Sequence, residues 1–285
     1  MKVLISGAAS LVGTHFARRL ARDHHVIALK HADLDITDAE AVRRSVATTA
    51  PDLIINPAVI QVDESERDPE LAFAVNVEGA RALAQAAERA GIPIIHFSTQ
   101  YAFDGETVER PPYTIEDAPR PVNVYGKTKV ASEKAVADAC SRSYIIRTSW
   151  VFGQGKNTFL CTVHKDLVAR KPISVIVDIW SSTTYVEDLI DRVLEIVARG
   201  RYGIYHVVNG GVCSYYDFAL EAGQLVGLTA KEIDQVIKKL HESEMQRSAV
   251  RPRYTPLRCL LSERLGLAPM RDWRAALAAY VRSST

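Results

Sequence analysis

The first twenty residues constrain the fold of this chain more than any other stretch. Val3–Ile5 is a short apolar run, a turn with two glycines follows, and an apolar pattern with helical spacing continues to Leu20. Strand, glycine turn and helix in this order form a βα unit that can bind phosphate, because the helix N-terminus presents free N–H groups and the positive end of its dipole. Gly7 permits the tight turn, and Gly13 lets helix and strand pack closely.

The residues beside this turn indicate which dinucleotide it would take. Ser10 stands where the usual pattern has its middle glycine, so a βα turn without a ligand is the alternative interpretation. The second predicted strand, His25–Leu29, is followed by Lys30. An acidic residue there would bind the adenosine ribose hydroxyls, whereas a cation accommodates a 2′-phosphate. Lys30 therefore favours NADP(H) over NAD(H), with a simply solvated lysine as the alternative.

Strands and helices alternate through the first half of the chain. Further strands are predicted at Leu53–Asn56, Ile94–Phe97 and Tyr144–Ile146, with one continuous helix from about residue 70 to 90. This alternation predicts an α/β fold with a doubly wound parallel sheet and helices on both faces. We expect a dinucleotide-binding Rossmann domain over residues 1–150.

The alternation loosens after residue 150. Two further βα-like units are predicted over 173–199 and 204–225, then a polar stretch of helical character without strand partners over 231–253, and a last helix over about 272–282. We expect residues 151–285 to form a smaller substrate-binding lobe, with some segments that return to the Rossmann sheet.

Composition excludes several classes of protein. The 35 Lys and Arg against 34 Asp and Glu give a net charge of +1, which argues against a nucleic-acid partner. The four cysteines are far apart and form no zinc-binding pair, so no metal site is predicted. The chain begins directly with a strand, which leaves no room for a signal peptide, and no apolar run reaches the ~18 residues of a membrane span. A cytoplasmic protein without a membrane partner is expected.

One later helix carries two residues of catalytic type. Tyr125 and Lys129 are four residues apart and therefore lie on one helix face. A phenol can donate a proton, and a neighbouring ammonium favours its phenolate form. Thr99 adds a hydroxyl at the end of a strand, where open α/β sheets place their sites. His96, inside the same strand, is interpreted as a core residue rather than a catalyst.

Five strings resemble a known family. They are LDITD at 34–38, FSTQYAFDG at 97–105, NVYGK at 123–127, RTSWVFG at 147–153 and DWRAAL at 272–277. Together they resemble the extended short-chain dehydrogenase/reductase superfamily, and within it the family of dTDP-4-dehydrorhamnose reductases. The YAFDG and RTSW strings are far more specific to this branch than the glycine turn.

The resemblance implies a reduction. NADPH, with NADH as an alternative, would deliver a hydride to the ketone carbon of a 4-keto nucleotide sugar, the expected substrate. Tyr125 would donate the proton and Thr99 would hydrogen-bond the same oxygen. Lys129 would contact the nicotinamide ribose and lower the pKa of Tyr125.

The resemblance also implies binding residues. For the cofactor they are Gly7, Ser10, Leu11, Val12, Gly13, Lys30, Asp35, Ile36, Asn56, Pro57, Ala58, Asn76, Ser98, Tyr125 and Lys129. For the substrate they are Gln100, Tyr101, Trp150, Asn157 and Arg251. Trp150 would pack on the sugar, or else be a core aromatic. Arg251 would pair with the diphosphate, or else form a surface salt bridge.

The chain departs from the family's pattern around the expected sugar pocket. Gln100 stands where the family usually has aspartate, and Pro57 and the 60–61 pair replace part of an alanine-rich loop that contains tyrosine. The string at 180–184 replaces one of Gly-x-Pro-Thr type. The same chemistry on an altered sugar is the simplest interpretation. The acidic residues that bind magnesium between subunits in some members have no convincing counterpart.

Two other functions remain open from the sequence. One is a nucleotide-sugar epimerase or dehydratase that keeps NAD bound, against which Lys30 counts. The other is a non-catalytic NADP-binding regulatory subunit similar to the β subunit of methionine adenosyltransferase, which the strings at 111–113 and 125–129 also resemble. A homodimer is compatible with each of these functions.

Overall fold

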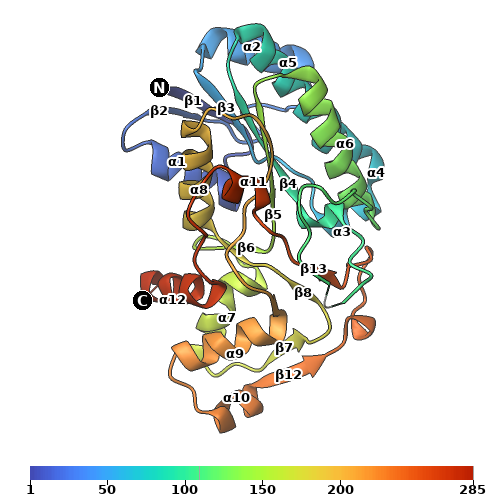
Figure 1. The fold of residues 1–285 in the computed structure, drawn as a ribbon, viewed down its shortest axis with the longest axis vertical. Coiled ribbons are helices and arrows are strands. Elements are labelled where there is room, and N and C mark those ends of the chain that lie inside the picture. Colours follow the sequence, from blue (N-terminus) through green and yellow to red (C-terminus); the bar gives the residue numbers. More distant parts are fainter. Residues whose placement is uncertain (109, 285) are drawn as a thin grey trace.

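Six parallel strands form the main sheet of the computed structural model, which describes residues 1–108 and 110–284 (Figure 1). They are β1 (Lys2–Ile5), β2 (His25–Ala28), β3 (Leu53–Asn56), β4 (Ile94–Thr99), β5 (Ser143–Thr148) and β10 (Gly203–His206). Their order is β10-β5-β4-β3-β1-β2. Because β2 and β3 lie on opposite sides of β1, the connections change direction there, and open sheets bind ligands at the carboxyl ends of such strands. The predicted doubly wound sheet is confirmed.

Helices cover both faces of this sheet. On one face lie α1 (Leu11–Leu20) and α8 (Val186–Ala198), and on the other lie α2 (Ala39–Thr49), α5 (Ala80–Ala90) and α6 (Val124–Ala139). Alternate strand residues enter the two cores: Val3 and Ile5 pack with the first pair, and Leu4 packs with the second set. Burial on both faces explains why these strands read as continuous apolar runs.

The helix predicted over 70–90 is divided into three parts. The structure has α4 (Pro69–Phe73), a π-helical turn η1 (Ala74–Gly79) and then α5, and it adds a helix α3 (Val62–Arg67) that was not predicted. A Cβ atom on Gly79 would lie 2.6 Å from Cγ1 of Ile36, so this turn packs closely on the segment before α2. The contact joins distant parts of the chain, and the local apolar pattern therefore does not reveal it.

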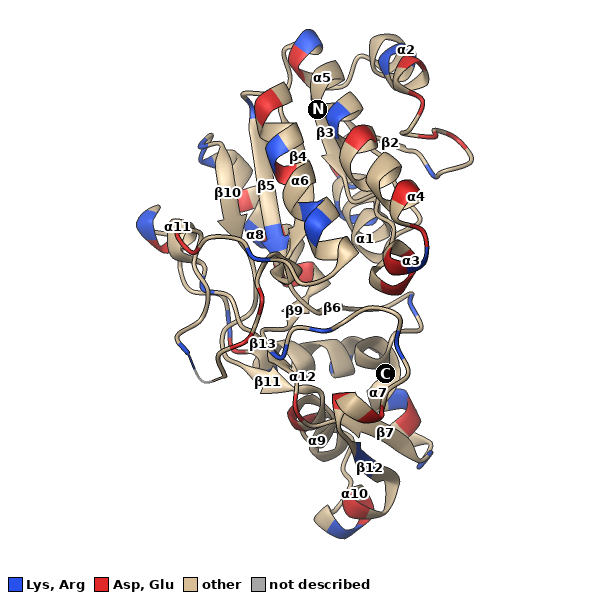
Figure 2. Ribbon diagram, turned by 90° about the vertical axis from the view of Figure 1, so that its right-hand side faces the viewer, with Lys and Arg blue, Asp and Glu red and all other residues tan. Residues whose placement is uncertain are grey.

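The second half of the chain forms a smaller lobe at one end of the sheet (Figure 2). Two elements, α8 and β10, return to the main sheet, whereas α7, α9, β7, α10 and β12 lie at the far end in Figure 2. The bounds are β6 (Val151–Phe152), α7 (Phe159–Val168), β7 (Ile173–Ile176), β8 (Trp180–Ser181), β9 (Thr184–Tyr185), β11 (Cys213–Ser214), α9 (Tyr215–Leu225), α10 (Ala230–Val236), β12 (Ile237–Leu240), β13 (Tyr254–Thr255), α11 (Leu260–Arg264) and α12 (Trp273–Ser284). Two short 3₁₀ helices complete the set, η2 (Gln100–Ala102) and η3 (Glu242–Glu244).

One expectation about this half is wrong, and another is confirmed with an unexpected pairing. The strand and the helix predicted over 173–199 exist as β7 and α8, but β7 lies outside the main sheet and pairs in parallel with β12, with Ile173 opposite Ile237. The stretch 231–253, predicted to have helical character without strand partners, is helical only in α10 and the short η3 and supplies β12 itself. Because the two strands lie far apart in sequence, neither pattern alone indicates the pairing.

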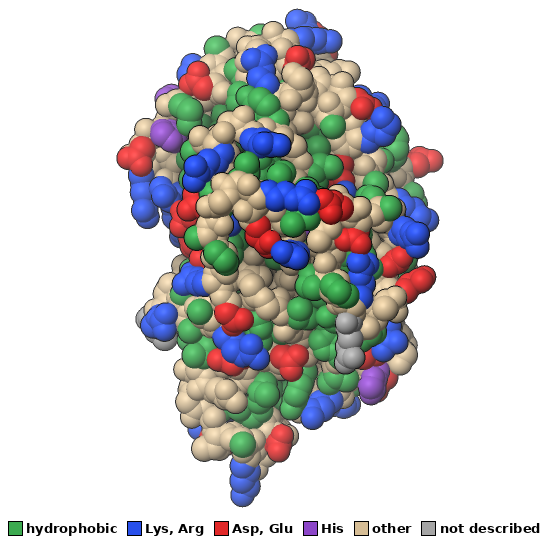
Figure 3. Space-filling model, viewed as in Figure 1, with side chains coloured by type: hydrophobic (Ala, Val, Ile, Leu, Met, Phe, Trp, Pro, Cys, Tyr) green, Lys and Arg blue, Asp and Glu red, His purple; other side chains and the backbone are tan. Residues whose placement is uncertain are grey.

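The surface is mixed in charge. On the face drawn in Figure 3, basic and acidic side chains are interspersed, and neither sign gathers into one broad area. No helix within residues 1–108 and 110–284 has the length and apolar character to cross a membrane. The same residues contain no group of three or more His, Cys, Asp and Glu side chains that could hold a metal ion.

Candidate active site

The turn after β1 is shaped by two glycines. Gly7 has a φ of +59°, and a Cβ atom on it would lie 2.7 Å from Cα of Ala58. A Cβ atom on Gly13 would lie 2.6 Å from the carbonyl oxygen of Gly7. Ser10 needs no glycine because its φ is −69°, and its Oγ accepts a hydrogen bond from the N–H of Gly13 at 3.0 Å, which caps α1. These close approaches bring the ends of β1 and β3 against the start of α1.

The resulting cradle fits the diphosphate of a dinucleotide. Leu11 and Val12 are the first residues of α1, so their N–H groups have no acceptor within the helix. They lie at the helix N-terminus, which is the positive end of the helix dipole. Pro57 is buried after β3, and Lys30 is exposed after β2. Asp35 is also exposed, and its carboxylate accepts from the N–H and hydroxyl of Thr37, which lowers the pKa of Asp35.

The start of α6 lies directly on the segment after β4. Asn123 caps the helix by accepting from the N–H of Gly126 at 2.8 Å. A Cβ atom on Gly126 would overlap the carbonyl oxygen of Tyr101, so only glycine permits this approach. The rings of Tyr101 and Tyr125 then meet edge to face, with centroids 5.7 Å apart, and the Tyr125 phenol lies close enough to the Thr99 side chain for Thr99 to influence its pKa.

Burial keeps Tyr125 protonated. It raises the pKa of Tyr125 to about 12, while the Thr99 side chain lowers that pKa and the nearby Tyr101 raises it. Thr99 in turn donates to Oε1 of Gln100 at 3.0 Å and accepts from the N–H of Tyr101 at 3.1 Å. The phenol is therefore in the form that can donate a proton. Lys129 was expected to lower the pKa of Tyr125. This effect stays a prediction, because the group that lowers the pKa of Tyr125 in this structure is Thr99.

Lys129 lies one turn further along α6, with 2% of the residue exposed. Burial lowers the pKa of Lys129 to about 8, and the carboxylate of Glu133 raises it. Glu133 forms a buried ion pair with Arg147 of β5 at 2.6 Å and accepts a hydrogen bond from the Ser98 hydroxyl. The hydroxyl of Ser98, predicted as a cofactor contact, is thus used inside the protein.

The lobe presents an aromatic pair toward these residues. Trp150 follows β5 with a φ of +40°, which is rare for a bulky side chain and often marks a functional site. Its ring stacks on Tyr215, with centroids 3.9 Å apart. Burial raises the pKa of Tyr215, and the nearby Tyr101 raises it further, so Tyr215, which was not predicted, lies near the predicted residue Tyr101 as well as against Trp150. No local pattern marks Tyr215, because it lies on α9, far along the chain.

Three other residues predicted to bind cofactor or substrate either bond other protein groups or lie exposed. Arg251 pairs with Asp63 of α3 at 2.6 Å, and its guanidinium is largely buried. The amide of Asn76, in the π-helical turn, accepts from the N–H of Ile60 at 2.8 Å and donates to the Thr128 hydroxyl at 3.0 Å. Asn157 is exposed in the loop between β6 and α7.

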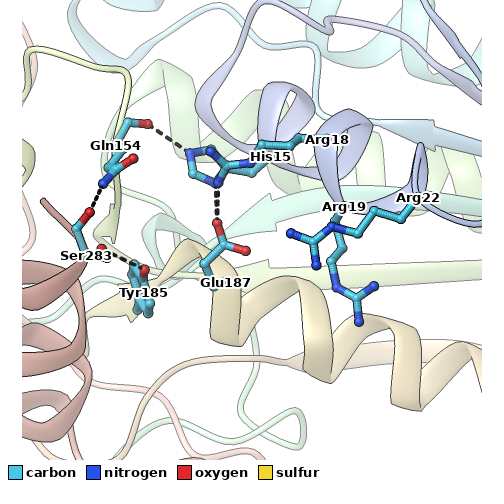
Figure 4. A pocket seen from close by; sticks show the side chains of 8 residues that line it. All are labelled: His15, Arg18, Arg19, Arg22, Gln154, Tyr185, Glu187 and Ser283. Atoms are coloured by element: carbon cyan, nitrogen blue, oxygen red, sulfur yellow. Dashed lines mark hydrogen bonds and ion pairs between the residues drawn. The ribbon is translucent and has the colours of Figure 1, made fainter.

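Two cavities lie away from Tyr125 and Lys129. One, of about 360 Å³, lies between α1, α8 and the end of α12 and is lined by Arg18 and Arg19 of α1 and by Arg22 just after it (Figure 4). Arg18 pairs with Glu187 at 2.6 Å, and His15 contacts the same carboxylate at 2.7 Å. Glu187 therefore neutralises part of the positive charge of this cavity. The other, of about 280 Å³, lies at the carboxyl end of β10 and contains the buried Ser262.

The whole chain matches one family. The model of the RmlD substrate binding domain matches residues 1–285. This chain belongs to that family. A relative named dTDP-4-dehydrorhamnose reductase from Mycolicibacterium smegmatis is 39% identical over 97% of this chain and 84% of its own length. A probable dTDP-4,6-dihydroxy-2-methyloxan-3-one 4-ketoreductase from Streptomyces antibioticus is 34% identical over 97% of this chain and 93% of its own.

Solved structures give the same family. A dTDP-4-dehydrorhamnose reductase from Bacillus anthracis in complex with NADP is similar with a TM-score of 0.92 and 30% identity, over 99% of both chains. A UDP-glucose 4-epimerase from Thermotoga maritima is similar with a TM-score of 0.82 over 100% of this chain and 99% of its own, but it is 18% identical, which shows the shared fold alone. The predicted resemblance to the dTDP-4-dehydrorhamnose reductases is confirmed.

Replacing Gly126 tests how α6 is placed. We expect Gly126→Ala to lower the free energy of unfolding by about 1–3 kcal/mol, because the methyl group forces the helix away from Tyr101. Urea unfolding measures this change. The neighbouring exposed residue offers a control, since Lys127→Ala should change stability by no more than about 0.5 kcal/mol. Equal stability of the two variants would contradict the close approach.

Proposed function

We propose that this protein uses NADPH to reduce the 4-keto group of a dTDP-activated deoxy sugar. The observation that carries the proposal is the placement of Tyr125 close to Thr99, with Lys129 one turn away on the same helix, beside the carboxyl ends of the central strands. The relatives from Mycolicibacterium smegmatis and Streptomyces antibioticus carry the names of reductases of such sugars, which supports the substrate class.

The cradle after β1 supports the cofactor. The first turn of α1 would hold the diphosphate, and the exposed Lys30 would face a 2′-phosphate. A similar structure from Bacillus anthracis was solved with NADP. When bound, the nicotinamide supplies the hydride.

The residues of α6 and β4 then manage the proton. Tyr125 donates its phenolic proton to the carbonyl oxygen as negative charge develops there. Thr99 holds that oxygen, once its hydroxyl turns from Gln100 to the substrate. The ammonium of Lys129 offsets the phenolate left on Tyr125, which burial alone would make costly.

The lobe would bind the rest of the substrate. The stacked pair of Trp150 and Tyr215 offers an apolar wall for the sugar. Arg251 would bind the diphosphate in place of Asp63, and the similar Arg247 now pairs with Glu242 at 3.1 Å. Gln100, buried beside Thr99, would contact a sugar hydroxyl through its amide instead of a carboxylate.

Removing the phenolic hydroxyl tests the proton donor. We expect Tyr125→Phe to bind NADPH as the unchanged protein does, and to lower kcat about 10²–10⁴-fold, because only the acid is lost. Turnover is followed as loss of NADPH absorbance with dTDP-4-dehydrorhamnose. Tyr202→Phe, at an exposed tyrosine between α8 and β10, is the matched control. Full activity of Tyr125→Phe would show that another group supplies the proton.

Reversing one charge tests the cofactor preference. Lys30→Asp should shift the ratio of kcat/KM for NADPH over NADH by about tenfold or more toward NADH, because a carboxylate repels the 2′-phosphate and can accept from the ribose hydroxyls. Lys231→Asp, on the exposed surface of α10, controls for the change in net charge. An unchanged ratio in Lys30→Asp would remove Lys30 from the cofactor site.

The pH profile tests the charge on Lys129. Because burial lowers its pKa to about 8, the ammonium is present below that pH and is lost above it. Tyr125, with a pKa of about 12, stays protonated throughout this range. We therefore expect kcat to fall as pH rises through about 8. A rate that stays level through that pH would mean that the ammonium does not assist the reaction.

A further inference from the structure

Four buried polar side chains connect the dinucleotide turn to the catalytic helix. They are Ser6 after β1, Asn56 at the end of β3, His96 in β4 and Ser132 in α6, and each is at most 1% exposed. Buried polar groups are costly unless they are hydrogen-bonded. Here each one bonds the next, at 2.8 Å from Ser6 to Asn56, 3.2 Å from Asn56 to His96 and 2.9 Å from His96 to Ser132.

The direction of each hydrogen bond fixes the form of His96. Oδ1 of Asn56 accepts from both the Ser6 hydroxyl and the N–H of Ala58, at 2.8 and 3.2 Å, so Nδ2 must face the imidazole. Nδ2 can only donate, and Nδ1 of His96 is therefore the acceptor. Nε2 carries the hydrogen and donates to Ser132, whose own proton goes to the carbonyl oxygen of Lys129 at 2.7 Å. His96 is thus neutral, with its hydrogen on Nε2.

This tautomer decides what His96 can do to Lys129. Nζ of Lys129 lies 3.4 Å from Nε2 of His96, and both nitrogens carry hydrogen. The imidazole therefore cannot accept a hydrogen bond from the ammonium. With the hydrogen on Nδ1 instead, a lone pair on Nε2 would face Nζ and bind it. The other charged groups near Lys129 are Glu133 on its own helix and, paired with it, Arg147 of β5.

We propose that Asn56 and His96 are positioning residues for Lys129: the asparagine selects the imidazole tautomer that cannot bind the ammonium. The N–H donors of Lys129 then remain available to the ribose of the cofactor and to the phenol. Through Ser132, the same imidazole fixes the turn of α6 that carries the lysine. The proposal rests on the role given to Lys129 under the proposed function.

The tautomer itself can be measured in the unchanged protein without ligand. Nitrogen-15 NMR of labelled histidine distinguishes a protonated ring nitrogen from an unprotonated one. We expect the His96 signals to show hydrogen on Nε2 and none on Nδ1, without titration across the range in which the protein is folded. Hydrogen on Nδ1, or a His96 that becomes charged near neutral pH, would overturn the proposal.

Asn56→Asp tests the effect on Lys129. The carboxylate keeps the acceptor for Ser6 and Ala58 but removes the donor to His96, so the imidazole hydrogen moves to Nδ1 and the lone pair on Nε2 binds Nζ. The pKa of Lys129 should rise by about one unit or more. NADPH should bind about tenfold more weakly, because one hydrogen bond from a charged group is diverted. Fluorescence titration of NADPH across pH reads both changes.

Asn209→Asp is the matched control. Asn209 is equally buried, at the carboxyl side of β10, and its amide donates to Asp188 at 2.7 Å, on the helix α8 that covers the opposite face of the sheet from α6. This variant should lose stability without moving the pH at which NADPH affinity falls. A similar result for Asn56→Asp, with the His96 tautomer changed, would overturn the link to Lys129. If the unchanged protein binds no NADPH, the proposed function fails, and nitrogen-15 NMR of the lysine amine then measures the shift directly.

Discussion

The buried ion pair between Glu133 and Arg147 is the contact on which the geometry of the site depends. Arg147 donates to both carboxylate oxygens, at 2.6 and 2.8 Å, and both side chains are at most 5% exposed. Such a pair contributes more to orientation than to net stability, but loss of either partner leaves a buried charge. Tyr125, Lys129 and Glu133 follow one another at intervals of four residues on α6. The ion pair that holds Glu133 against β5 therefore also fixes the position of α6 along the sheet, and with it the position of the Tyr125 phenol relative to Thr99.

One physical cause prepares both ionisable groups of the site. Removal from water disfavours charge, so it raises the pKa of Tyr125 and lowers that of Lys129. At neutral pH the phenol is still protonated and the amine still charged, which is the combination that a proton donor with cationic support requires. A chain of buried hydrogen bonds connects this helix to the strands without adding a charge. It is formed by Ser6, Asn56, His96 and Ser132.

The sequence predicts what depends on local spacing. Apolar runs locate the strands of the main sheet, and the interval between Tyr125 and Lys129 places both on one helix face. It does not reveal what depends on contacts between distant segments. The π-helical turn packs Gly79 on Ile36, β7 pairs with β12, and Tyr215 stacks on Trp150. His96 reads as an ordinary core residue for the same reason, because its tautomer is set by Asn56 on a neighbouring strand.

The ion pair of Arg251 with Asp63 is one of the contacts that hold the two halves of the chain together. The segment around Arg251 crosses to the first half, where Asp63 accepts from the guanidinium at 2.6 Å and from the N–H of Ala249 at 3.3 Å. Asn123, the cap of α6, donates to the carbonyl of Val250 at 2.8 Å. An anion that binds Arg251 must compete with Asp63. Its affinity is therefore reduced by the free energy of that ion pair, and its binding loosens one of the contacts that hold this segment beside the start of the catalytic helix.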